Sequence, residues 1–311
     1  MRISDYDKFD YDYKTYWEKR SYENEAEHKA INSLLRGRKG GFFLDIGGSY
    51  GRLLETYSER FENPVILDYS LKTLQRNSEI LKSQFPHLHL VAANVYFMPF
   101  RENVFDGAMM IRVLHHIERP AEYLEEIRKV MRPGAVYLQE FANKIHLKAR
   151  IRALLRLDFS FFSHTPYQQP TQQNFEGSNG QETVFLNYHP THIKRLLRNT
   201  GFEVHGARGT SFFRLDTLKR LIPQHLLLGF EAVSQRLLSW LNISPSVILS
   251  AALPQRQTPI NNYASLEDIL VCPRCKSALS FESDSATCTK CKGSYRKVEG
   301  IWDFRVDEDE S

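Results

Sequence analysis

The sequence predicts an α/β fold with a mostly parallel sheet, and three observations lead to this prediction. Short apolar runs alternate with segments of helical periodicity from residue 42 to residue 140. The runs are apolar at successive positions, as is typical of strands covered on both faces. Glycine, acidic and amide residues follow the runs directly, at the strand ends where open parallel sheets bind ligands. Repeated β-α units of this kind imply right-handed crossovers.

Seven strands are expected, at residues 42–46, 65–68, 88–92, 104–111, 135–140, 202–204 and 246–253. Helices are expected at residues 18–35, 51–61, 70–85, 120–130, 144–157, 191–200 and 215–241. Ser70 is a suitable N-cap, and Pro120 suits the first turn of its helix. Gly201 stops the helix that precedes it, and Pro223 divides the last helix in two.

The first strand leads into a glycine-rich turn, Asp45-Ile-Gly-Gly-Ser-Tyr-Gly51. Glycine allows a sharp turn and lets a ligand approach the main chain. We expect a helix from Gly51, whose N-terminal amides favour a negative or polar group. A phosphate-binding loop is excluded because Arg52-Leu53 replaces the Lys and Ser/Thr that it needs, and the glycine spacing does not fit a dinucleotide fold. Asp68 lies about twenty residues beyond the first loop glycine. In dinucleotide-binding folds a carboxylate at this position binds the ribose.

These features resemble the class I S-adenosylmethionine (SAM) dependent methyltransferases, close to the branch with ubiquinone/menaquinone-type enzymes. Residues 45–51 are similar to the first motif, with Ser49 at the middle glycine, and Asn94-Val95 is similar to an Asp-Ala pair at the adenine edge. The segments that resemble later motifs are Met98-Pro-Phe100, Val104-Phe-Asp106, Val113-Leu-His-His116 and Met131-Arg-Pro-Gly134. The resemblance covers residues 40–140 closely and 1–253 loosely.

The resemblance implies a Rossmann-like, doubly wound, mostly parallel seven-stranded sheet that binds SAM. The cofactor-binding residues that it implies are Asp45, Gly47, Gly48, Ser49, Gly51, Asp68, Tyr69, Asn94, Val95 and Ile111. An N-terminal helix covers the cofactor in that family, which makes Tyr16, Trp17 and Arg20 candidate lid residues. An amphipathic helix packed on the sheet edge is the alternative for this segment.

His115 and His116 follow the fourth strand, beside the expected position of the methyl group. Either can act as a catalytic base if the acceptor holds its proton at neutral pH. Structural packing of one of them is an open alternative. After the fifth strand, residues 141–190 are expected to form a cap over the acceptor, with His164, Tyr167 and Tyr188 facing it.

Residues 144–157 combine five basic residues with Ile145, Leu147, Ile151, Leu154 and Leu155, and residues 215–241 are strongly apolar. For the basic helix, a substrate lid, a nucleic-acid contact, a membrane-surface helix and an ordinary solvated face all remain open. For the apolar segment, the alternatives are a core helix and a contact with an apolar substrate or a bilayer surface. No apolar run reaches the roughly 18 residues of a transmembrane helix.

Two Cys-x-x-Cys pairs, Cys272/Cys275 and Cys288/Cys291, hold all four cysteines of the chain. Their spacing predicts a closed, structural tetrahedral zinc site. Disulfides are the alternative, and the lack of a secretory signal disfavours them. The segment resembles the small zinc-ribbon family of methyltransferase activators, at Leu266–Lys276 and at Tyr295–Phe304, with Trp302 where proline is usual. Members of that family bind methyltransferases by strand addition.

The expected organisation is a methyltransferase domain at 1–253, a linker at 254–262, a zinc ribbon at 263–305 and an acidic tail at 306–311. A net charge of +4 neither requires nor excludes nucleic acid. With no leader recognised, we expect a cytoplasmic enzyme. Its acceptor is expected to be a small molecule, lipid or glycan, methylated at O or C. An RNA methyltransferase and an inactive SAM-binding protein are the alternatives, and the oligomeric state is not defined.

Overall fold

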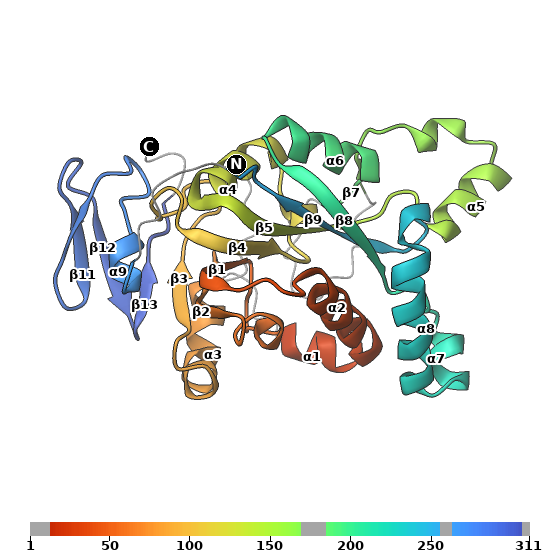
Figure 1. Cartoon of the computed structure of the whole chain (residues 1–311), viewed down its shortest axis with the longest axis horizontal. Coiled ribbons are helices and arrows are strands. Elements are labelled where there is room, and N and C mark those ends of the chain that lie inside the picture. Colours follow the sequence, from red (N-terminus) through yellow and green to blue (C-terminus); the bar gives the residue numbers. More distant parts are fainter. Residues whose placement is uncertain (1–12, 169–184, 256–262, 307–311) are drawn as a thin grey trace, which may run out of the picture.

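The computed structural model describes residues 13–168, 185–255 and 263–306. One sheet of eleven strands runs through this part of the chain, in the order β10-β11-β12-β13-β3-β2-β1-β4-β5-β9-β8 (Figure 1). Its first seven strands in chain order are β1 (Gly40–Ile46), β2 (Phe61–Asp68), β3 (His89–Ala92), β4 (Phe105–Met110), β5 (Met131–Ala142), β8 (Glu203–Thr210) and β9 (Ser246–Ala252). Strands β1 to β5 are parallel, and β9 is antiparallel to both β5 and β8. The predicted mostly parallel, doubly wound sheet is confirmed.

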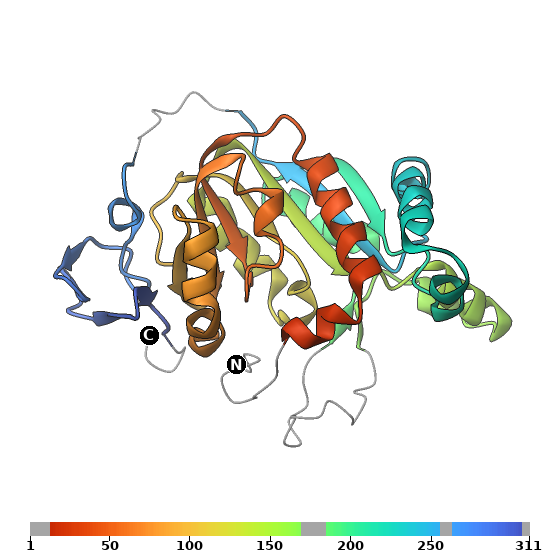
Figure 2. The same ribbon diagram turned by 90° about the horizontal axis from the view of Figure 1, so that it is seen from below.

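Helices cover both faces of the sheet (Figures 1 and 2). On one face lie α1 (Tyr13–Glu18), α2 (Ser21–Leu34) and α3 (Leu71–Gln84), and on the other α4 (Pro120–Val130) and α6 (Pro190–Asn199). Two cores result, because successive side chains of a strand point to opposite faces. Phe42, Leu44 and Ile46 of β1 belong to the core beneath α4, whereas Phe43 packs with α2 and α3.

The remaining elements follow β5 and β8. Helix α5 (Leu147–Leu155) confirms the predicted basic helix in shortened form, and β6 (Tyr167–Gln168) pairs with β7 (Leu186–Asn187). Pro223 separates α7 (Asp216–Leu221) from α8 (Gln224–Leu237), as predicted. Within the described ranges no helix combines the length and the hydropathy that a membrane span requires.

The helix predicted from Gly51 to Phe61 is wrong. A single 3-10 turn, Leu54–Thr56, stands there, among other turns. Phe61 pairs with Gly40 at the start of β1, so residues 47–60 must return along the full length of that strand. Only nine residues lie between Gly51 and Phe61, at most about two and a half turns of helix, and they form turns instead.

The C-terminal segment extends the sheet beyond β3. Helix α9 (Leu266–Ile269) precedes the antiparallel strands β10 (Leu279–Phe281), β11 (Ser285–Cys288), β12 (Ser294–Val298) and β13 (Ile301–Asp303). Strand β13 pairs in parallel with β3, and the Phe304 amide continues this pairing by donating to the Ala92 carbonyl at 2.8 Å. Trp302 and Phe304 are buried in the same core as the parallel strands. An edge that would otherwise expose unpaired backbone groups is thereby covered.

Backbone bonds at a second place tie the same segment to the loop after β3. The amide of Val271 donates to the Pro99 carbonyl at 2.9 Å, and that of Arg101 to the Ile269 carbonyl at 2.8 Å. The Lys276 ammonium donates to the Met98 carbonyl at 2.8 Å. The division into residues 1–253 and 263–305 stays a prediction, because sheet and core are continuous across it.

A Cys272→Ser variant should lose bound metal and also destabilise the entire chain. Because β13 is part of the main sheet, we expect the thermal midpoint to fall by at least about 5 °C, where 1 kcal/mol corresponds to roughly 2–4 °C. Elemental analysis and differential scanning calorimetry would measure the two effects. Ser280→Ala, an exposed change in the same segment, is the control. Wild-type protein purified with fewer than one zinc ion per four cysteines would contradict this prediction.

Candidate active site

The glycine-rich turn leaves β1 with a strained backbone. Gly47 and Gly51 have φ of 71° and 75°, and a Cβ at Gly47 would overlap the Val113 side chain. Ser49, at the middle position of the motif, has φ of 51° and so adopts the left-handed conformation that glycine adopts most readily. The departure from glycine at this position therefore preserves the course of the backbone.

Asp68 lies at the end of β2 and closes this turn. One carboxylate oxygen accepts the Ser49 amide and the other the Ser70 amide, each at 2.9 Å. Carboxylate oxygens are the acceptors that hydroxyl groups of a ribose require. The predicted ribose-binding acid is thus held rigidly beside the turn.

Asp45 lies inside the protein beneath the turn. Its side chain is buried and accepts the Tyr57 hydroxyl at 2.9 Å. Burial raises the pKa of Asp45 to about 7. A Cβ on Gly48 would press against this carboxyl group. Asp45 therefore supports the turn from below.

Asn94 follows β3 and is buried. Its side-chain oxygen accepts the Tyr96 amide at 3.0 Å, while its amide group donates to the Val306 carbonyl at 3.5 Å. The Arg305 guanidinium lies 5.9 Å from the centre of the Tyr69 ring. The segment after β13 thus borders two residues that the sequence predicts at the nucleoside. Spacing and composition gave no signal for this contact.

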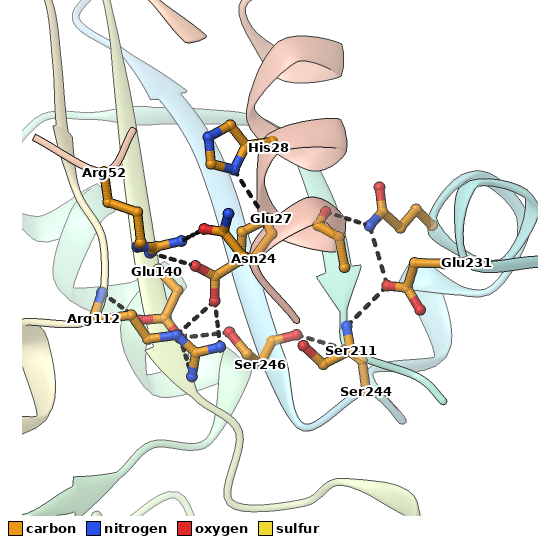
Figure 3. A network of polar contacts seen from close by, with 12 residues as sticks. Asn24, Glu27, His28, Arg52, Arg112, Glu140, Ser211, Glu231, Ser244 and Ser246 are labelled. Atoms are coloured by element: carbon orange, nitrogen blue, oxygen red, sulfur yellow. Dashed lines mark hydrogen bonds and ion pairs between the residues drawn. The ribbon is translucent and has the colours of Figure 1, made fainter. Parts of the chain in front are cut away.

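A buried polar network holds α2 against the strand ends (Figure 3). Glu27 is fully buried and accepts Arg52 at 2.7 Å and the Arg112 Nε at 2.6 Å. Burial alone would raise the pKa of Glu27, but Arg112 and Arg52 outweigh it and lower the pKa. Arg52 also donates to Asn24 at 2.6 Å. A single carboxylate from α2 therefore joins the glycine-rich turn to the end of β4.

Arg112 has φ of 63°, a conformation that non-glycine residues rarely adopt. Its amide donates to Glu140 of β5 at 2.9 Å, and Glu140 in turn accepts the Ser246 hydroxyl of β9. Figure 3 shows these groups converging from separate strands. The sequence analysis missed Glu27, Arg112 and Glu140, because nothing in their local patterns distinguishes them from surface charges.

Helix α1 lies over this network. The Trp17 ring has the Arg52 guanidinium 3.7 Å and the Arg112 guanidinium 5.8 Å from its centre. Arg20 lies 4.3 Å from the centre of the Tyr16 ring. The three proposed lid residues are thus near the glycine-rich turn, in agreement with a lid role, which stays a proposal.

The two candidate catalytic histidines lie in a 3-10 turn, Leu114–His116, after β4. The His115 ring packs 4.0 Å from that of His116 and 4.2 Å from that of Phe185. Burial, with smaller effects of His116 and Arg112, lowers the pKa of His115 well below its usual value. His115 is therefore neutral at physiological pH. Asn187 of β7 lies nearby, and its buried side-chain oxygen has no partner among the described residues.

Other predicted residues lie around these groups. Ile111 directly follows β4 and is buried, and Val95 packs partly buried against the core. Tyr188 is a core residue whose hydroxyl donates to the Ile117 carbonyl at 3.5 Å, so its expected place in the acceptor pocket is wrong. His164 packs 4.5 Å from His189 instead. Residues 169–184 of the predicted cap lie outside the described part of the chain.

The four cysteines form a separate centre. Their sulfur atoms all lie within 4.8 Å of one another, and the cysteines are free thiols. The Cys288 sulfur accepts the amides of Lys290 and Cys291 at 3.4 Å. Lys276 and Lys292, each following the second cysteine of a pair, have φ of 55° and 60°. This symmetric set of sulfur donors fits a tetrahedral zinc ion with Zn–S bonds of about 2.3 Å.

Comparison with known proteins identifies the parallel part of the sheet. Residues 44–138 match the family described as a methyltransferase domain. The chain contains a methyltransferase domain. The domain spans β1 to β5 and so includes the glycine-rich turn, Asp68, Asn94 and both histidines.

Relatives match the same region. An uncharacterised methyltransferase of Arabidopsis thaliana is 31% identical over 37% of this chain and 34% of its own length. A demethylmenaquinone methyltransferase of Paenarthrobacter aurescens is 27% identical over 33% of this chain and 39% of its own length. An uncharacterised protein of Methanocaldococcus jannaschii is 28% identical over 73% of this chain and 86% of its own length. The chain thus spans little more than a third of the first two relatives.

Solved structures share the fold of the methyltransferase domain. A SAM-dependent methyltransferase of Thermotoga maritima, 13% identical, has a TM-score of 0.52 and covers 79% of this chain and 97% of its own. A chain from a Haloferax volcanii complex between the Trm112 methyltransferase activator and a putative methyltransferase is 14% identical and has a TM-score of 0.51. The match covers 78% of this chain and 96% of that one. At these identities the likeness concerns the fold alone.

The residues at the strand ends fit SAM. Asp68 provides a carboxylate of the kind that binds ribose hydroxyls, whereas the buried Asn94 side chain already bonds Tyr96 and Val306. Cβ atoms at Gly47 and Gly48 would meet Val113 and Asp45, so the close packing of the turn requires glycine at both positions. When bound, SAM supplies a sulfonium-activated methyl group.

Replacing Glu27 by Gln should destabilise the domain, because Arg52 loses its buried counter-charge and Arg112 keeps only Glu140, at 3.8 Å. Removing one partner of a buried ion pair costs about 3–5 kcal/mol, and we expect roughly 3 kcal/mol because the Arg112 side chain is 31% exposed. Urea unfolding would measure the change. Glu25→Gln, an exposed change on the same helix, should stay within about 0.5 kcal/mol of wild type. Equal stability of the two variants would refute the role of the network.

Replacing Asp68 by Ala should weaken SAM binding by at least about tenfold, the equivalent of 1.4 kcal/mol for one lost hydrogen bond to a charged group. Isothermal titration calorimetry would measure the affinity. Glu62→Ala, exposed at the opposite end of β2, is the control. Asp68→Asn retains one acceptor oxygen and should bind with intermediate affinity. Unchanged affinity of Asp68→Ala would remove this residue from the cofactor site.

Proposed function

We propose that this protein transfers the methyl group of SAM to an oxygen or carbon atom of a small-molecule or lipid acceptor. The main support is the position of three groups within the methyltransferase domain. The glycine-rich turn, Asp68 and Asn94 lie at the carboxyl ends of β1, β2 and β3, respectively. Ligands of open α/β sheets bind at this edge.

In this proposal the protein acts mainly by orientation. Asp68 would hold the ribose and Asn94 the adenine edge, while the glycine-rich turn would bring the backbone against the methionine part. Trp17 and α1, fixed through Arg52 and Arg112, would exclude water. Orientation of reacting groups lowers barriers by up to roughly 7–11 kcal/mol in favourable intramolecular cases.

The surroundings of the histidines support an uncharged acceptor. His115 has a lowered pKa and packs against the rings of His116 and Phe185, so its immediate surroundings are uncharged and aromatic. A neutral imidazole can accept a proton from a hydroxyl group as the methyl transfers. The name of the demethylmenaquinone methyltransferase relative agrees with an acceptor of quinone type.

Incubation of the protein with methyl-labelled SAM and a fractionated cell extract tests this proposal. We expect label in the lipid or small-metabolite fraction, and at least tenfold less with Asp68→Ala under the same conditions. Glu62→Ala should label as wild type does. Label in RNA would support the alternative of an RNA methyltransferase. Calorimetric binding of SAM with no label in any fraction would support an inactive binding protein.

A further inference from the structure

Two helices at one end of the molecule have their apolar sides turned outward. Figures 1 and 2 both show α5, α7 and α8 together at the end opposite the cysteine cluster. On α5, Ala149 and Ala153 face the protein, whereas Leu147, Ile151 and Leu155 are 50–82% exposed. The small residues are thus inside and the large aliphatic ones outside, the reverse of an ordinary surface helix.

Helix α8 repeats this inversion. Its buried positions include Glu231 and Gln235, whose side chains form hydrogen bonds inside the protein. Glu231 accepts the Ser211 amide at 2.8 Å, and the Gln235 amide group donates to the Ala26 carbonyl at 2.8 Å. Four large apolar residues of this helix, Leu226, Phe230, Val233 and Leu237, are each about half exposed or more, beside the exposed His225 and Arg236.

Helix α5 contacts the segment that follows α8. Arg150 of α5 donates to the carbonyls of Leu241 and Asn242 at 2.8 and 3.0 Å, and the Leu147 amide donates to the Ile243 carbonyl at 2.9 Å. Trp240, between α8 and this junction, is 74% exposed. We call the whole exposed set the apolar face: Leu147, Ile151, Leu154, Leu155, Leu157, Phe159, Leu221, Leu226, Phe230, Val233, Leu237 and Trp240. Exposed apolar groupings of this size on a soluble domain mark an interaction surface.

The charges beside the apolar face are mostly positive. Lys148, Arg152 and Arg156 are exposed on and just after α5, and Asp158 is the one acidic residue between positions 144 and 168. Arg220 is exposed at the end of α7. A second copy of this chain would bring like charges together on the same surface. Anionic lipid headgroups instead provide both the counter-charge and an apolar interior.

We propose that the apolar face docks this protein on the surface of an anionic lipid bilayer. The exposed aliphatic residues and Trp240 insert at the headgroup level, and the cations of α5 pair with lipid phosphates. Helix α5 begins five residues after β5 ends, and α8 contacts α2, which carries Glu27, through the 2.5 Å bond between Tyr22 and Glu231. This placement would present the site to acceptors dissolved in the membrane.

Vesicle flotation of the full-length protein tests docking, without SAM or acceptor, so that the result is independent of methyl transfer. The probes are vesicles of phosphatidylcholine with phosphatidylglycerol, and vesicles of phosphatidylcholine alone. We expect wild type to float with the anionic vesicles and at least tenfold less with the neutral ones. The double variant Leu155→Glu/Phe230→Glu should lose at least tenfold in binding. Ile80→Glu, an equally exposed apolar position on α3, should bind as wild type.

A second pair of variants tests the charges. Lys148→Glu/Arg152→Glu should reduce binding to anionic vesicles severalfold, while the exposed Lys39→Glu should leave it unchanged. Failure of wild type to float, or an equal loss in Ile80→Glu, would overturn the proposal. So would a dimer in sedimentation that Leu155→Glu/Phe230→Glu dissociates without any vesicle binding. Salt-dependent binding to bulk RNA that Lys148→Glu/Arg152→Glu abolishes, again without vesicle binding, would assign the surface to nucleic acid instead.

Discussion

The buried carboxylate of Glu27 imposes the constraint on which the site depends. An ionised carboxylate without water is strongly unfavourable unless cations and hydrogen bonds compensate it. Here Arg52 and Arg112 both do so, and they come from the glycine-rich turn and from the end of β4. The position of α2 is therefore determined jointly with the backbone of the site. The Trp17 ring on the preceding helix lies 3.7 Å from the Arg52 and 5.8 Å from the Arg112 guanidinium, so α1 is held by the same two cations.

Local patterns in the sequence predicted the central strands well, because β1, β2, β3 and β9 contain continuous apolar runs. Two helix starts also carry a recognisable residue. Ser70 accepts the Thr73 amide as an N-cap should, and α4 begins at Pro120. The helix after Gly51 was predicted wrongly for a reason outside the local pattern. The register of β2 against β1 sets the distance that residues 47–60 must span, and register depends on pairing of strands that the chain brings together later.

The site could be predicted only where a motif is contiguous. The glycine-rich turn, Asp68 and Asn94 belong to such motifs, whereas Glu27 and Val306 reach the site from distant parts of the chain. Patterns of hydrophobicity were also ambiguous for residues 215–241. The sequence indicates an apolar helix, but only the structure shows that Glu231 and Gln235 are buried while Leu226 and Leu237 are exposed. A buried hydrogen-bond network, unlike a core of leucines, leaves no periodic signature.

Pairing of β13 with β3 occupies the edge at which a separate polypeptide could add a strand. Since both strands belong to one chain, the edge is filled intramolecularly, at an effective concentration that dilution does not change. Each methyltransferase domain therefore has its own cysteine-rich segment, in a fixed one-to-one ratio. Supply of this segment cannot be limited by competition among several client enzymes, as supply of a diffusible subunit can.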